Sequence, residues 1–169
     1  MTGHANPADY GRDEMHELLA AGARLEDRPS AAAALHLLTF TDLPGRRDFA
    51  RHVHVENVTG AGSGTITGAG SGTITGAWVR DWQALLTDGS VYVSSGPRRL
   101  LEVAASYATG RPVDLRETGS GLGTAHAGRL IEAAVIGTGM AEYYTLTGTA
   151  KLAGLRATQA KLAGQEGSR

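Results

Sequence analysis

The chain has 169 residues, enough for one globular domain, and its 41% hydrophobic and 20% charged residues are typical of such a domain. A net charge of −1 excludes a general attraction to nucleic acid or anionic membranes, and the lack of cysteine excludes disulfides and thiolate metal ligands. No apolar run approaches the roughly 20 residues of a membrane span, and the first residues lack a secretory signal pattern. We therefore expect a cytoplasmic protein without a membrane partner, and the scarcity of lysine beside abundant alanine and glycine indicates a bacterial origin.

Two helices are predicted near the N-terminus, after a flexible tail at residues 1–8. The first covers about residues 10–25, and its expected apolar face consists of Met15, Leu18, Leu19 and Leu25. The second has Asp27 as its predicted cap and Pro29 in its first turn, and it ends before Pro44. The short connection predicts that the two helices pack antiparallel.

A change of period after Gly45 predicts a strand over residues 52–58. Val53 and Val55 alternate with His52, His54 and Glu56, so the valines are expected inside and the polar residues outside. An eight-residue Gly-rich sequence then occurs twice, over residues 59–66 and 67–74. We interpret residues 58–77 as an insertion that forms either a hairpin, in which residues 65–67 pair with 73–75, or a flexible linker.

The clearest single element is a helix over about residues 97–109. Val91, Tyr92 and Val93 predict a strand before it, Ser94 or Ser95 can cap its free backbone N–H groups, and Gly110 can end it. Its expected apolar face consists of Leu100, Val103, Ala104, Tyr107 and Ala108.

Three further elements are predicted behind this helix. A short element begins at residue 113, and Thr124 caps a helix with Ala127, Leu130, Ile131, Ala134 and Val135 on one face. Residues 143–147 predict a strand, and a last helix carries a stripe of Leu152, Leu155 and Leu162 before a flexible tail at 165–169. The whole pattern predicts one α+β domain at residues 9–164, mostly helical, with its helices packed on a small antiparallel sheet.

Two small clusters are candidate binding sites. Ser94, Ser95, Arg98 and Arg99 surround a helix start, where free N–H groups and the helix dipole favour an anion. His52, His54 and Glu56 alternate along a strand, and two imidazoles on one face can share a metal ion if further ligands complete the set. A plain helix cap and exposed strand histidines explain the same residues without a ligand.

No cofactor fingerprint or catalytic constellation is found, and we expect no cofactor. The leading hypothesis is a non-enzymatic protein-interaction or assembly module, with Leu152, Leu155 and Leu162 as a contact surface. One alternative is a DNA-binding regulator with a helix-turn-helix-like unit at about residues 97–136, which carries a modest group of arginines. The other is a small metal-dependent enzyme that uses His52 and His54.

Overall fold

The computed structural model describes residues 6–58, 74–147, 149–151, 153–154 and 157. As predicted, the fold is α+β and mostly helical, with a small antiparallel sheet. The described helices and strands are η1 (Pro7–Asp9), α1 (Arg12–Glu26), α2 (Pro29–Thr39), η2 (Leu43–Gly45), α3 (Arg47–Ala50), β1 (Val53–Val58), β2 (Ile74–Val79), α4 (Trp82–Thr87), α5 (Ser95–Thr109), α6 (Leu115–Gly119) and α7 (Thr124–Gly137). No helix among these residues is both long and apolar enough to cross a membrane.

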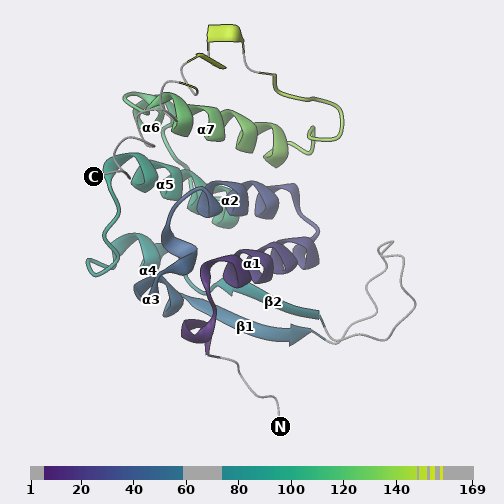
Figure 1. Cartoon of the computed structure of the whole chain (residues 1–169), viewed down its shortest axis with the longest axis vertical. Coiled ribbons are helices and arrows are strands. Elements are labelled where there is room, and N and C mark those ends of the chain that lie inside the picture. Colours follow the sequence, from purple (N-terminus) through teal and green to yellow (C-terminus); the bar gives the residue numbers. More distant parts are fainter. Residues whose placement is uncertain (1–5, 59–73, 148, 152, 155–156, 158–169) are drawn as a thin grey trace.

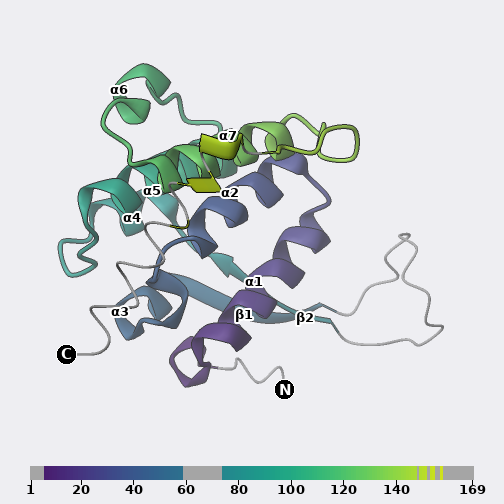
Figure 2. The ribbon, with the colours of Figure 1, turned by 45° about the horizontal axis from the view of Figure 1, so that its top comes forward.

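The elements are stacked in layers, from the β1–β2 ribbon to α7, and the chain that follows α7, with helical residues at 150–151 and 153–154, continues beyond it (Figure 1). Helix α1 packs against β2, and α2 packs against both α5 and α7. Figure 2 shows α1 and α2 as the predicted antiparallel hairpin, with α7 on the side of α2 that faces away from the strands. The side of α7 that faces away from α2 is therefore not covered by any of the elements α1–α6.

The sheet has the predicted inward face. Val53 lies opposite Val79 and Val55 opposite Ala77, and the side chains of Val53, Val55 and Ala77 are buried. Val58 and Ile74 pair with each other as the last residue of β1 and the first of β2, so both ends of the predicted insertion, residues 58 and 74–77, are strand residues. Residues 59–73, with most of the repeat, lie outside the described residues.

The close approach of α1 to β2 occurs at Gly22. A β-carbon on Gly22 would lie 2.2 Å from the carbonyl oxygen of Ala77 and 3.0 Å from the Trp78 indole. Gly22 therefore permits the contact, and it is buried with Met15 and Leu19. Leu25, expected on the same face, is instead exposed.

Two groups of buried side chains form the core, and α5 contributes to both. Leu101 and Ala105 pack with residues of α1, α3, α4 and the strands, whereas Leu100, Val103 and Ala104 pack with residues of α2 and α7. The predicted apolar face of α5 is thus confirmed, with Leu101 and Ala105 added on a second side. Because it contacts both groups, α5 joins the strand layer to the α7 layer.

Helix α7 is oriented differently from the prediction. Ala133 is buried, and Leu130 and Ile136 pack beside it against α2 and α5, whereas Ile131 and Ala134 are exposed. The helix is apolar on more than one side, and the core contacts the stripe 130–133–136 rather than the expected one. This places an apolar stripe at the surface.

Two predicted strands are wrong. At residues 90–93, Val91 is buried and Tyr92 exposed, but the segment is a loop whose Tyr92 carbonyl accepts a hydrogen bond from Arg46 at 2.7 Å. The Arg46 guanidinium takes the place of the neighbouring strand that the β-branched and aromatic residues predicted. Residues 143–147 form the end of a turn and an irregular segment instead of a strand. The N–H groups of Tyr143 and Tyr144 both donate to the Met140 carbonyl, at 3.0 and 3.1 Å.

The predicted helix caps are partly wrong. Ser94 is the N-cap residue of α5, but its side chain makes no capping hydrogen bond. Asp27 does not cap α2; it ends α1 in a left-handed conformation with φ 47°, and Arg28 takes the N-cap position. Gly110 ends α5 with φ 74°, as predicted.

Candidate functional site

The main candidate site consists of the exposed side of α7 and the segment that follows α7 in the sequence. We call it the α7 surface, and its residues are Thr124, Ile131, Ala134, Thr138, Met140, Tyr143, Tyr144 and Leu146. Eight large apolar side chains are exposed among the described residues. Two of them, Leu25 and Tyr92, lie elsewhere, and the other six lie on α6, on α7 or directly after α7: Leu115, Ile131, Met140, Tyr143, Tyr144 and Leu146. Single exposed apolar residues are ordinary, whereas a concentration of them marks an interaction surface.

The exposed stripe of α7 carries no charge. Thr124, Ile131 and Thr138 are exposed at seven-residue intervals, and Ala134 lies between the last two. Ile131 is 56% exposed and Tyr143 75% exposed. Tyrosine supplies a large rigid contact area with a polar tip and is enriched in protein interfaces.

The two charged residues of α7 face α2 instead. Arg129 Nη1 donates a hydrogen bond to Glu132 Oε2 at 2.9 Å, and the His36 ring nitrogen Nε2 lies 2.9 Å from the same oxygen. The Arg129 guanidinium also lies 4.8 Å from the centre of the Phe40 ring. Burial raises the pKa of the Glu132 carboxyl, but the hydrogen bonds and charges of His36 and Arg129 together lower it by more. The pKa of Glu132 therefore lies below its ordinary value. This cluster attaches α7 to α2 and leaves the outer stripe neutral.

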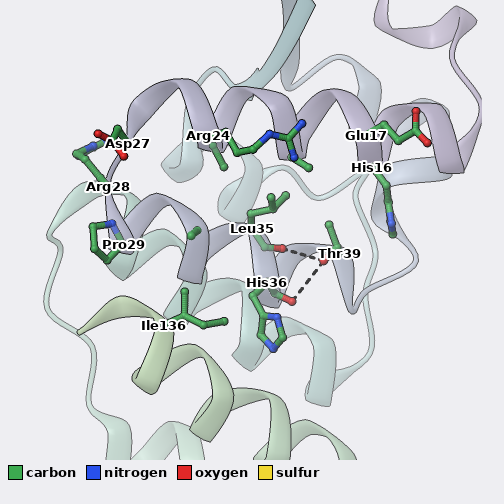
Figure 3. Close-up of a pocket in the computed structure, with 13 residues that line it drawn as sticks. His16, Glu17, Arg24, Asp27, Arg28, Pro29, Leu35, His36, Thr39 and Ile136 are labelled. Atoms are coloured by element: carbon green, nitrogen blue, oxygen red, sulfur yellow. Dashed lines mark hydrogen bonds between the residues drawn. The ribbon is translucent and has the colours of Figure 1, made fainter. Parts of the chain in front are cut away.

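A second candidate site is the groove between α1 and α2, which has a volume of about 750 Å³ (Figure 3). Its apolar part comes from alanines of both helices, with Leu35 and Ile136, and its polar groups come from both helices. Figure 3 shows His16, Glu17 and Arg24 on α1 opposite His36 and Thr39 on α2. Grooves of this size with an apolar base and a few polar groups are suited to small ligands.

His16 is the most unusual polar group of this groove. Burial, followed by the positive charge of Arg12, lowers the pKa of its imidazole. Its Nε2 atom is buried and has no hydrogen-bond partner among the described residues. The ring is thus favoured in its neutral form.

The predicted anion cluster is placed at the start of α5, but its arginines already have partners. Arg98 Nε donates to Glu102 Oε1 at 3.3 Å, and Arg99 donates to the Ser120 carbonyl. Ser94 and Ser95 begin the helix without a side-chain cap. The Arg98 guanidinium is thus paired within α5 and that of Arg99 with the α6–α7 loop, which weakens the case for an anion site.

The predicted metal residues are not gathered around one point. His52 is buried, contrary to expectation, and its Nε2 lies 2.8 Å from Asp88 Oδ2. The His54 ring stacks on Trp78 with ring centres 5.4 Å apart, while Glu56 is exposed. Within the described ranges, no three or more His, Asp or Glu side chains are placed to hold a metal ion.

The predicted DNA-binding unit corresponds to α5, α6 and α7. Its third helix would have to read bases, yet the exposed stripe of that helix is uncharged, and Arg129 is paired on the other side. Arg111 also donates to Gln83. Phosphate contacts require free cationic groups, so this arrangement gives the DNA-binding alternative little support.

The leucine stripe cannot be compared with these sites, because Leu152, Leu155 and Leu162 lie outside the described residues. The α7 surface was missed at the sequence level, although a signal existed: α7 contains only two charged residues, too few for a polar outer face.

Comparison of the chain with protein-family models, with curated proteins and with solved structures finds no match.

Proposed function

We propose that this chain is a non-enzymatic assembly module that associates with a second copy of itself through the α7 surface. The observation that supports the proposal is the concentration of exposed apolar side chains on α6, on α7 and behind α7. In a symmetric dimer the same surface of both copies forms the contact, and a charge close to the two-fold axis faces a like charge. The stripe of Thr124, Ile131, Ala134 and Thr138 is uncharged and avoids that repulsion.

The stripe also suits helix packing. Its exposed members are three and four residues apart between Ile131, Ala134 and Thr138, the spacing at which side chains share one helix face. The small side chain of Ala134 allows the backbones of two such helices to approach, while Ile131 supplies the apolar contact. Tyr143 and Tyr144 extend the contact beyond the end of α7.

The test is the molar mass of the full chain, measured by light scattering and native mass spectrometry over a range of protein concentrations. We expect a monomer–dimer equilibrium that Ile131→Asp weakens by about tenfold or more, because a carboxylate is costly inside an apolar contact. Tyr92→Asp is the matched control, because Tyr92 is 77% exposed on the loop before α5 and is not part of the α7 surface.

A third variant, Leu155→Asp, distinguishes the α7 surface from the predicted leucine stripe. Loss of the dimer with Leu155→Asp but not with Ile131→Asp would move the contact to the C-terminal segment. A monomer at all concentrations would refute self-association. A stoichiometric metal ion in the mass spectrum would instead favour the metal-dependent alternative.

A further inference from the structure

A pocket with both tryptophans of the chain in its wall lies between α1, α2 and β2, and we call it the tryptophan pocket. Its volume is about 210 Å³. Trp78 and Trp82 line it together with aliphatic side chains that include Leu19, Leu35, Ala31 and Ala108. Its two charged residues, Glu26 and Arg28, pair with each other.

The position of Trp78 depends on several other residues. A β-carbon on Gly76 would lie 2.6 Å from Cη2 of the indole, and one on Gly22 would lie 3.0 Å from Cε2. His54 stacks on the ring at an interplanar angle of 21°. Two glycines and a stacked imidazole thus hold the indole against the pocket.

Trp82 is held from a different direction. It begins α4, where the Asp81 carboxylate accepts hydrogen bonds from the N–H groups of Gln83 and Ala84 at 2.8 and 2.9 Å. Its ring packs against both groups of core residues. Both aromatic walls are therefore positioned by the fold and need little rearrangement to receive a ligand.

We propose that the tryptophan pocket binds a small, uncharged aromatic molecule with a single substituted ring. The volume supports this size, because an apolar protein cavity of about 150 Å³ holds benzene. The lining supports the class, because indole rings stack with or meet the edge of another aromatic ring, and aliphatic side chains favour an uncharged one. Glu26 and Arg28 neutralise each other and offer no free charge that would select an ionic ligand.

The experiment is a titration of the full chain, labelled with nitrogen-15, with toluene as the probe. Its nuclear magnetic resonance spectrum contains two tryptophan indole N–H signals, and both belong to the pocket. We expect both signals to shift with toluene in a saturable way, and the melting temperature to rise.

Two alanine substitutions separate this pocket from the neighbouring groove. Ala108 lines the tryptophan pocket but not the α1–α2 groove, and Ala20 lines the groove but not the tryptophan pocket. Ala108→Leu should weaken toluene binding by about tenfold or more, because the added carbons occupy the space of the ring. Ala20→Leu should change it by less than about twofold, since its side chain fills the other site.

Circular dichroism of each variant checks its fold, and Ala108→Val replaces Ala108→Leu if the larger side chain prevents folding. The proposal is overturned if neither indole signal shifts up to toluene saturation. It is also overturned if Ala20→Leu abolishes binding while the Ala108 variant retains it, because the ligand would then occupy the groove. Neither result depends on whether the chain forms a dimer.

Discussion

Gly22→Ala tests whether the packing of α1 on β2 is as close as the structure shows. The added methyl group would lie 2.2 Å from the carbonyl oxygen of Ala77 and 3.1 Å from its carbonyl carbon. These are backbone atoms of a strand that pairs with β1, so they cannot rotate away as the end of a side chain could. Either α1 or β2 must shift.

Two opposing effects set the magnitude. Alanine in place of glycine in a helix gains about 0.5–1 kcal/mol, because it restricts the unfolded chain. Overpacking of a buried contact costs about 1–3 kcal/mol. Since the clash is with backbone, we expect a cost of about 2–3 kcal/mol, and a gain of about 1 kcal/mol leaves a net loss of about 1–2 kcal/mol in the free energy of unfolding. That loss corresponds to a melting temperature lower by about 2–8 °C for a chain of this size.

Urea denaturation followed by tryptophan fluorescence measures this change, and Trp78 lies at the clash itself. Gly119→Ala is the matched control, because Gly119 ends α6 and a β-carbon there would meet nothing within 4 Å. The control should leave the free energy of unfolding unchanged or raise it by up to about 1 kcal/mol. A Gly22→Ala protein as stable as the wild type would refute the close helix–strand contact.

Two further predictions concern the strand layer and the α7 layer. Hydrogen bonds from the backbone N–H and hydroxyl of Ser90, followed by one from His52, lower the pKa of Asp88 to about 2. A carboxyl group with a lowered pKa stabilises the fold at pH values above its unfolded pKa of about 3.9, so Asp88→Asn should lower the free energy of unfolding at pH 7. The difference from the wild type should shrink as the pH falls from about 4 to 2. A difference that stays constant over this pH range, measured by urea unfolding, would contradict the lowered pKa of Asp88. Leu37 is completely buried between α2, α5 and α7, so Leu37→Ala should cost about 2–5 kcal/mol in the same assay, and a loss below about 1 kcal/mol would show that this core group is not tightly packed.

The elements that could be predicted are those with several agreeing local signals. Helix α5 combined a regular apolar face with Gly110 at its end, and both are present in the structure. The β1 strand followed from alternation, because a half-buried strand must place every second residue inside. The segment at 90–93 has the β-branched and aromatic residues of a strand, but its Tyr92 carbonyl accepts a hydrogen bond from the Arg46 side chain instead of a strand neighbour. This contact joins residues that are 46 positions apart in the sequence.

The candidate sites depended on long-range contacts in the same way. His52 was expected at the surface, but it precedes the first residue of β1 and turns inward to Asp88, which is 36 residues away. His54 was expected beside His52, but it stacks on Trp78, its cross-strand neighbour. Strand alternation alone placed these rings on one face, and the partners that separate them come from β2 and the loop after α4.

The orientation of α7 shows most clearly what a single sequence leaves open. A helix with one apolar face has only one way to bury it, whereas α7 has apolar residues at 125, 127, 130, 131, 133, 134, 135 and 136, which surround most of its circumference. In the structure Glu132 lies against His36 of α2 and Arg129 lies over the Phe40 ring, and Ala133 between them and the core is buried. These polar contacts favour the orientation in which this side of the helix faces inward. Ile131 and Ala134, which a helical wheel assigns to the core, are then left at the surface. The hydrogen bond between Glu132 and His36 thus belongs to the orientation that leaves the uncharged stripe at the surface, and through this stripe we expect two copies to associate.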